Sequence, residues 1–274
     1  MRTVSLTLLV GGLCALLAAP AVEARCSLDS VLVGPTCVDK YEASVWSIPP
    51  QKTLLIAKVK LGVATLANLT AGGATQLGAA PNSCSGSDYG SDFPNTGNWT
   101  APLYAVSVPG VLPSTCATWF QAEQACALSG KRLLWNQEWQ RAAAGTVDPG
   151  SNNGLLNAMC NTSATVPRAT GLAGATPGGA DSCISNWGVQ DMVGNVWEWV
   201  GDWGDLAQGC TNWSNTFGDD LSCIGDGTAT GATLPGALIR GGAGNIGSSA
   251  GVFAVRGDFV PSFADPIIGF RCAR

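Results

Sequence analysis

The chain has 274 residues, of which 46% are hydrophobic and only 12% are charged, and it contains 36 glycines. This length and hydrophobic content suffice for one large domain with a sizeable core, and the glycine content is typical of a loop-rich protein. The net charge of −5 and the lack of any basic run argue against binding to nucleic acid, which needs a footprint of Lys and Arg. The sequence contains no histidine, which excludes Ser-His-Asp and Cys-His catalysis and histidine-ligated zinc.

The N-terminus has the pattern of an export signal. Arg2 supplies a positive charge, residues 6–19 form an apolar run too short to span a bilayer, and Val22-Glu-Ala24 has the spacing of a signal-peptidase site. We expect residues 1–24 to be a signal peptide, with cleavage near Ala24, and the mature chain to be secreted, periplasmic or on the cell surface. No other stretch of the sequence is apolar over the length of a transmembrane segment.

Ten of the eleven cysteines remain once Cys14 is removed with the signal peptide. An even number of cysteines in an exported chain predicts disulfides, here up to five. The sequence does not give the pairing, although short loops favour Cys26 with Cys37 and Cys210 with Cys223. The lack of a Cys-x-x-Cys spacing argues against a zinc cluster or a thioredoxin-like redox pair.

The first half of the mature chain contains one predicted strand and one predicted insertion. Residues 37–46 alternate apolar and polar side chains, a pattern that predicts an early strand. Residues 51–98 are rich in Ala, Gly, Thr, Asn and Ser without strong periodicity. We interpret this stretch as an insertion on the surface of the domain.

Two helices are predicted between residues 118 and 145. Thr118 and Gln121 have the spacing of a capping box for a helix over 119–129. Asn136 is expected to cap a second helix that runs to Gly145.

The most informative stretch, residues 191–203, contains three tryptophans and three carboxylates. Tryptophans are costly to expose, so Trp197, Trp199 and Trp203 are expected to lie inside the domain. Carboxylates are not buried without partners. Both demands are met if Asp191 and Glu198 converge on a hard cation, with backbone oxygens from the turn between them completing a calcium site.

Gly-Asn-Val-Trp-Glu-Trp at residues 194–199 resembles the signature of the formylglycine-generating-enzyme (sulfatase-modifying factor) superfamily, whose domain is a variant of the C-type-lectin fold. Residues 118–133, Arg240-Gly-Gly242 and Gly269-Phe-Arg271 resemble further motifs of that family. The resemblance implies a single α+β domain over residues 25–274, loop-rich and stapled by disulfides. It also implies a structural Ca²⁺ ion held by the side chains of Asp191 and Glu198 and by the backbone oxygens of Met192, Gly194 and Val196.

The catalytic groups of the family are missing from the sequence. Formylglycine-generating enzymes use a copper-binding cysteine pair just after the Arg-Gly-Gly segment, whereas no cysteine lies here between Arg240 and Cys272. Ala or Ser does not replace a thiolate as nucleophile or soft-metal ligand. The related iron enzymes of ergothioneine synthesis need histidine ligands. We therefore expect no enzymatic activity of either type.

The C-terminal segment, residues 240–274, resembles the variable region of proteins diversified by retroelements. In those proteins, scattered solvent-facing positions of a lectin-like domain are rewritten by adenine-directed mutagenesis. The corresponding side chains here mix bulky apolar, charged and small types with no regular period, which suits a binding surface in which Phe and Arg act as anchors. The predicted ligand-binding residues are Ala243, Asn245, Ile246, Ser248, Ser249, Arg256, Asp258, Phe259, Phe263, Asp265 and Ile267.

Three functions remain open from the sequence. The first is an exported protein that binds a ligand, either a protein or another cell-surface molecule, through this diversifiable segment. The second is a formylglycine-generating-type oxidase of sulfatase cysteines, which the missing cysteine pair disfavours. The third is a structural accessory protein of the cell envelope, which is favoured if the C-terminal side chains prove to be core. The same side chains, notably Phe259, Phe263 and Ile267, therefore decide between binding surface and core.

Overall fold

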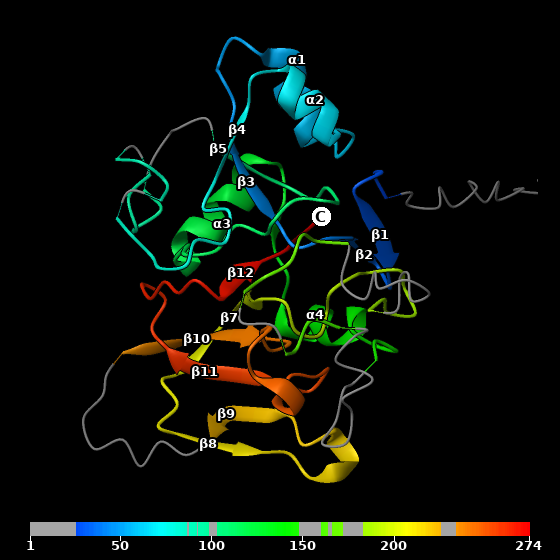
Figure 1. The fold of residues 1–274 in the computed structure, drawn as a ribbon, viewed down its shortest axis with the longest axis vertical. Coiled ribbons are helices and arrows are strands. Elements are labelled where there is room, and N and C mark those ends of the chain that lie inside the picture. Colours follow the sequence, from blue (N-terminus) through cyan, green and yellow to red (C-terminus); the bar gives the residue numbers. More distant parts are fainter. Residues whose placement is uncertain are drawn as a thin grey trace, which may run out of the picture.

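The computed structural model describes residues 26–86, 88–91, 93–98, 103–147, 160–163, 166–171, 183–225 and 234–274, so the predicted signal peptide lies outside the described residues. These ranges contain α-helices together with mostly antiparallel sheets, which confirms the predicted α+β class (Figure 1). Within those ranges, none of the helices combines the length and the apolar character that a membrane crossing requires.

The largest sheet has six strands in the spatial order β12-β7-β10-β11-β9-β8. Its neighbours are antiparallel except for β12 with β7 and β11 with β9, which are parallel. A short 3-10 turn, η2 (Asn215–Phe217), separates β8 from β9, and another, η3 (Gly247–Ser249), separates β10 from β11. The strands are β7 (Trp197–Asp205), β8 (Gly209–Asn212), β9 (Leu221–Gly225), β10 (Pro235–Arg240), β11 (Val255–Phe259) and β12 (Ile268–Phe270).

Two smaller sheets complete the fold, and the four-stranded one brings the two ends of the described chain together. In the four-stranded sheet, the last strand β13 (Cys272–Ala273) lies between β2 (Thr36–Asp39) and β6 (Arg132–Leu133), and β1 (Ser30–Val33) flanks β2. The three-stranded sheet has the order β4-β3-β5 and consists of β3 (Ser44–Ser47), β4 (Thr75–Leu77) and β5 (Leu103–Val106). The single strand predicted for residues 37–46 is therefore wrong, because β2 and β3 belong to different sheets.

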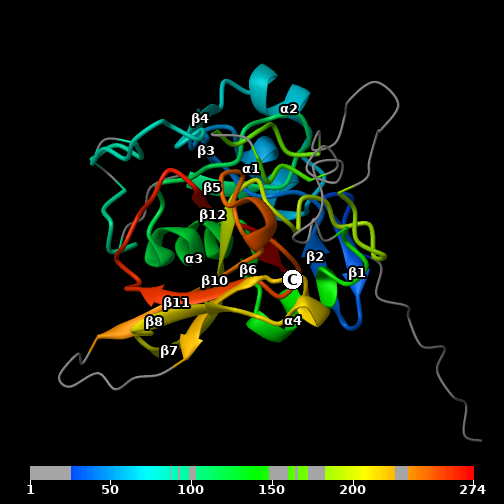
Figure 2. The ribbon, with the colours of Figure 1, turned by 60° about the horizontal axis from the view of Figure 1, so that its bottom comes forward.

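Two helices cover opposite faces of the six-stranded sheet (Figure 2). Helix α3 (Trp119–Leu128) begins with the predicted capping box, in which the N–H of Gln121 donates to the Thr118 hydroxyl at 3.2 Å and the N–H of Thr118 donates to the Gln121 side chain at 3.0 Å. Helix α4 (Asn136–Ala142) starts one residue earlier than expected, since Trp135 rather than Asn136 is its cap, and it ends before Gly145. The Asn136 N–H instead donates to Asp202 at the far end of β7.

The stretch predicted as an insertion, residues 51–98, contains helices that its weak periodicity did not reveal. They are α1 (Thr53–Lys60) and α2 (Leu66–Ala71), and α2 has its own capping box formed by Thr65 and Asn68. Leu55, Val59 and Leu69 are buried against Trp46 and Tyr104 of the three-stranded sheet. Both helices lie at one end of the molecule, opposite β8 and β9 (Figure 1).

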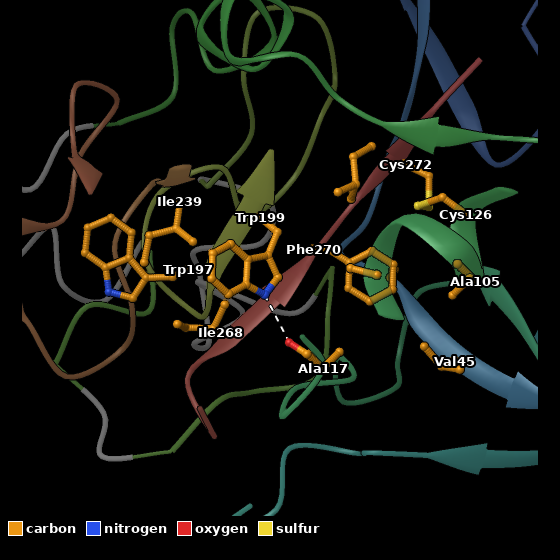
Figure 3. Packing of buried hydrophobic residues seen from close by; sticks show 14 of the residues in the cluster. Val45, Ala105, Ala117, Cys126, Trp197, Trp199, Ile239, Ile268, Phe270 and Cys272 are labelled. Atoms are coloured by element: carbon orange, nitrogen blue, oxygen red, sulfur yellow. Dashed lines mark hydrogen bonds between the residues drawn. A yellow bond between two sulfur atoms is a disulfide. The ribbon is translucent and has the colours of Figure 1, made fainter. Parts of the chain in front are cut away.

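The main core lies between α3 and the six-stranded sheet. Trp197 and Trp199 of β7 are each 1% exposed, and Phe270 of β12 is fully buried beside them (Figure 3). The indole N–H of Trp199 donates to the Ala117 carbonyl at 3.0 Å, which satisfies its polar atom as burial requires (Figure 3). The expectation that Trp203 is also inside is wrong, because this residue is 44% exposed.

All ten described cysteines form disulfides, as the sequence predicts. The two local pairs expected from loop length, Cys26–Cys37 and Cys210–Cys223, are confirmed. The Cys126–Cys272 bridge ties α3 to the last strand across 146 positions of sequence. The remaining pairs are Cys84–Cys116 and Cys160–Cys183.

Candidate functional site

The first candidate site is the buried ion pair between Glu198 and Arg271, at the start of β7. Strand β12 runs parallel to β7 and places Gly269 opposite Glu198, so Arg271 follows directly beside it. Glu198 accepts hydrogen bonds from Arg271 Nη2 at 2.6 Å and from the indole N–H of Trp139 at 2.7 Å. Burial opposes the charge on Arg271, but Glu198 outweighs it and raises the pKa of the guanidinium, which therefore stays charged.

Two further buried carboxylates lie around this ion pair. Glu42 accepts hydrogen bonds from the side-chain amide of Asn195 and from the N–H of Val196. Burial, together with the charges of Asp191 and Glu198, raises the pKa of Glu42 well above its usual value. The site thus gathers three carboxylates, of Glu42, Asp191 and Glu198, around the single guanidinium of Arg271.

Asp191 is the least satisfied of these groups. One carboxylate oxygen, Oδ2, accepts the N–H of Gly171 at 2.8 Å. The other, Oδ1, is buried without a hydrogen-bond partner among the described residues. Burial raises the pKa of Asp191 to about 6, although the Gly171 N–H and the charge of Arg271 lower it. A buried carboxylate oxygen of this kind is costly unless another group binds it.

The residues predicted to bind calcium lie in the turn before β7 and at the start of that strand, and all are buried: Asp191, Met192, Gly194, Val196 and Glu198. The unpaired oxygen of Asp191 and the surplus of negative charge fit a hard cation, which prefers oxygen ligands. Glu198 already has a cationic partner in Arg271, so it is the member of the set least in need of one. The residues present fit a calcium ion most directly through Asp191.

Sequence reasoning missed two residues of this site, Glu42 and Asn195. Asn195 has a φ of 59° and lies at the centre of the turn: its amide donates to Glu42 and to the Arg168 carbonyl, and its oxygen accepts from Asn161 and from the Arg168 N–H. Glu42 had no clear signal in the sequence, because a carboxylate in an alternating apolar and polar pattern is expected to face solvent. Position 194, next to Asn195, requires a glycine. Its φ is 75°, and the Asn161 carbonyl occupies the place where a Cβ would be.

The second candidate site is the C-terminal segment, where buried and partly exposed positions alternate irregularly. The prediction that Ala243 faces solvent is wrong, because it is fully buried in the main core. Asn245 is exposed, and the other predicted residues are half-buried. We define the C-terminal surface as the ten predicted residues that reach solvent: Asn245, Ile246, Ser248, Ser249, Arg256, Asp258, Phe259, Phe263, Asp265 and Ile267.

Arg256, Asp258, Phe259 and Phe263 form one continuous group on this surface. The rings of Phe259 and Phe263 stack with centroids 4.6 Å apart, and the Arg256 guanidinium lies 4.3 Å from the centroid of Phe259. The same guanidinium forms an ion pair with Asp258 at 2.7 Å. Arg256 and Phe259 are three residues apart and would point to opposite faces of a regular strand, but a register shift between β10 and β11 brings them together.

Aromatic residues outside the C-terminal segment extend this surface. Phe259 of β11 and Trp203 of β7 both pair with Ala237 of β10, so their side chains project from the same face of the sheet. Trp203 packs edge-on against Trp119, with ring centroids 4.8 Å apart, and also against Phe120. The backbone N–H of Trp119 donates to the Pro261 carbonyl at 3.0 Å, which joins the start of α3 to the loop between Phe259 and Phe263.

Two buried charged residues, Arg240 and Asp220, hold the loop between β10 and β11. Arg240 donates to the backbone oxygens of Val252 and Ala254, each at 3.0 Å, and lies over the Trp139 ring. Asp220 accepts the N–H of Phe253 at 2.6 Å, and Gly251 lies so close to this carboxylate that no Cβ would fit. These contacts fix the ends of a loop whose outer positions are Asn245, Ile246, Ser248 and Ser249.

The sequence matches the family described as the Sulfatase-modifying factor enzyme 1-like domain over residues 90–274, more than half of the chain. The chain belongs to this family. The predicted fold, the α+β variant of the C-type-lectin fold found in formylglycine-generating enzymes, is thereby confirmed. Among curated proteins, this sulfatase-modifying-factor domain is 34% identical to the Inactive C-alpha-formylglycine-generating enzyme 2 of Bos taurus over 96 residues, which are 32% of this chain and 32% of that protein.

A second curated relative is the Hercynine oxygenase of Mycolicibacterium smegmatis, 34% identical over 99 residues, which are 34% of this chain and 22% of that protein. The chain thus spans about a third of the first relative and less of the second. Among solved structures, the Major Tropism Determinant P3c Variant is 20% identical and superposes with a TM-score of 0.48, covering 90% of this chain and 52% of that chain.

Proposed function

We propose that this protein is exported and binds a ligand, a protein or another cell-surface molecule, through its C-terminal surface, and that this surface is diversifiable in the manner of retroelement variable proteins. The observation that carries the proposal is the difference in burial between framework residues and surface residues within residues 240–274. Framework residues such as Gly242, Ala254 and Phe270 are buried, whereas the ten surface residues between them are exposed or half-buried, and four of these also pack against the main core.

The composition of this surface supports recognition. Arg and aromatic side chains dominate the energetics of protein interfaces, because they bury a large area at low entropic cost. Here Phe259 and Phe263 are held in place by their mutual stacking and by Arg256, so they are pre-organised before any ligand arrives. Five disulfides and the buried Glu198–Arg271 pair provide the rigid support that such a surface needs.

The hypothesis of a formylglycine-generating-type oxidase lacks the metal-binding side chains that such an enzyme needs. A copper-type site requires two thiolates, but every described cysteine is bonded to another cysteine, and residues 241–271 contain none. Histidine ligands for iron are absent from the whole sequence. We therefore place the function in binding rather than in catalysis. The structural-accessory interpretation needs these side chains to be core. Phe259, Phe263 and Ile267 do pack against the main core, but they are only partly buried and so keep contact with solvent.

A pair of displayed libraries tests the proposal. In the first, Asn245, Ser248, Ser249, Phe259 and Phe263 are randomised; in the second, the same number of buried framework residues, Ala243, Ala254, Val255, Ile268 and Phe270, is randomised. We expect more clones of the first library than of the second to remain protease-resistant, because the second removes fully buried side chains whereas the first removes side chains that are exposed or only half-buried. Similar losses in both libraries would mean that the C-terminal surface is core and would refute the proposal.

Sorting the folded clones of the first library on intact cells of the source organism tests binding itself. Clones with different cell-surface partners are expected to carry different residues at the five positions. Enrichment that is indifferent to these residues would assign recognition to another part of the molecule.

We also propose that the buried turn binds a structural Ca²⁺ ion. Asp191 would supply the main carboxylate ligand and the backbone oxygens of Met192, Gly194 and Val196 would be further ligands, while the carboxylates of Glu198 and Glu42 would help to balance the charge of the ion. When bound, the ion supplies positive charge to a site that otherwise holds three carboxylates and one guanidinium. Support comes from the buried Asp191 oxygen that lacks a partner among the described residues.

A further inference from the structure

The positive charges of this acidic protein are unevenly distributed. From Ala43 to Ser87 the sequence contains no acidic residue but three lysines, Lys52, Lys58 and Lys60, although the whole chain has a net charge of −5 and only five lysines. All three lie on or beside α1 and are exposed. The described part of the structure pairs none of them with a carboxylate.

Helix α1 carries apolar side chains on both its inward and its outward face. Leu55 and Val59 point inward and are buried, as expected of a helix that packs on a domain. The outward face carries Leu54 and Leu61, which are 81% and 64% exposed, with Lys58 between them. Positions 54, 58 and 61 share one face at helical spacing. A surface helix ordinarily presents polar side chains outward, so two exposed leucines flanking a lysine require a reason.

The surface around α1 continues this combination of apolar and basic groups. Leu28 and Val63 are 75% and 37% exposed and line a cavity of about 360 Å³ between the segment that joins α1 to α2 and the start of the described chain. Lys40 lines the same cavity, and its ammonium group donates to the Leu28 carbonyl at 2.9 Å. We call the area formed by Lys52, Leu54, Lys58, Lys60, Leu61 and Val63 the α1 pole.

We propose that the α1 pole docks the protein on an anionic lipid surface. Exposed leucines enter the boundary between headgroups and acyl chains, while lysines on the same helix bind the negative headgroups. The pole lies at one end of the molecule and the strands β8 and β9 lie at the other (Figure 1). Docking there leaves the six-stranded sheet directed away from the lipid. This inference stands on α1 alone and does not depend on ligand binding by the C-terminal surface.

Vesicle cosedimentation of the purified protein tests this proposal. We expect binding to vesicles of phosphatidylcholine mixed with phosphatidylglycerol and little binding to phosphatidylcholine alone. The variant Lys52→Gln with Lys58→Gln is expected to bind the anionic vesicles at least about tenfold more weakly, from the contribution of each lysine near such a surface. Salt of about 1 M is expected to abolish binding, because it shortens the Debye length to about 3 Å.

A matched control removes two exposed positive charges elsewhere, in Arg141→Gln with Arg168→Gln. This control has the same net charge as the lysine variant and is expected to bind within about twofold of the parent protein, since neither arginine belongs to the α1 pole. The variant Leu54→Ser with Leu61→Ser keeps every charge and is expected to lose binding as well. Melting curves of all variants establish that they fold.

Three results would overturn the proposal. The first is no binding of the parent protein to anionic vesicles, and the second is an equal loss in the lysine variant and in its arginine control. The third is binding of poly-glutamate, lost on substitution of Lys52 and Lys58, without any binding to vesicles, which would assign the pole to an acidic protein partner instead.

Discussion

The two ends of strand β7 carry the same kind of residue in opposite environments. Trp197 and Trp199 at its start are 1% exposed, whereas Trp203 near its end is 44% exposed. Strand β12 pairs with residues 197–199 only, so the first half of β7 is covered by a neighbouring strand and by α3. Beyond residue 199, β7 carries Trp203, which extends the C-terminal surface together with Trp119 and Phe120.

The difference shows how one strand can serve both the scaffold and the surface. At its buried end, the charge carried by the strand itself has a partner in the core, since Glu198 forms an ion pair with Arg271. At its exposed end, Trp203 packs edge-on against Trp119 and Phe120 and stays 44% exposed. Substitutions at the first end should therefore change stability, and substitutions at the second should change mainly recognition.

The largest effect is expected from breaking the buried ion pair. Arg271→Met leaves Glu198 buried without its cation and should reduce the free energy of unfolding by about 3–5 kcal/mol, measured by urea denaturation. Arg256→Met is the matched control, because it breaks the partly exposed pair with Asp258 and should cost about 1 kcal/mol or less. Equal losses in the two variants would remove the distinction between scaffold and surface.

Removal of calcium is expected to have the next largest effect. A site saturated at about a hundred times its dissociation constant contributes about 2.7 kcal/mol, so chelation should lower the melting temperature clearly. In Asp191→Asn, chelator should change the melting temperature little, because the main ligand is already gone. If the parent protein melts unchanged after elemental analysis confirms that all metal has been removed, the calcium proposal fails.

Truncation of the stacked phenylalanines should have an intermediate effect. Phe259→Ala and Phe263→Ala each remove a half-buried ring and should each cost about 1–2 kcal/mol, less than the 3–5 kcal/mol or so expected for the fully buried Phe270→Ala. A double-mutant cycle should give a coupling of about 0.5–1.5 kcal/mol for the stack. A loss as large as that of Phe270→Ala would show that these rings belong to the core.

The smallest effect on stability is expected at the exposed end of β7. Trp203→Ala should cost about 1 kcal/mol or less, because the residue is 44% exposed and its ring contacts are with Trp119 and Phe120. Its fluorescence should be quenched readily by acrylamide in the parent protein, and loss of this quenchable component in the variant identifies it. Protection of Trp203 from acrylamide would mean that another element covers the end of the strand.

Much of the scaffold was predictable because its signals are local. The capping box of α3, the short-loop disulfides Cys26–Cys37 and Cys210–Cys223, and the family motif around Glu198 all depend on residues close in sequence. The helices α1 and α2 were missed for the opposite reason. Their composition gives weak periodicity, and it is packing of Leu55, Val59 and Leu69 on the three-stranded sheet that stabilises them.

By itself, the sequence determined the fold class, the cysteine chemistry and the positions at which a binding surface or a cation site could lie. Only the tertiary structure decided which groups meet there. Glu198 faces Arg271 across 73 positions of sequence, Asn195 holds Glu42 across 153, and Ala243 is core while Asn245, two residues later, is exposed. Burial and charge pairing are properties of neighbours in space, and the bulge between β10 and β11 that aligns Arg256 with Phe259 has no local signal at all.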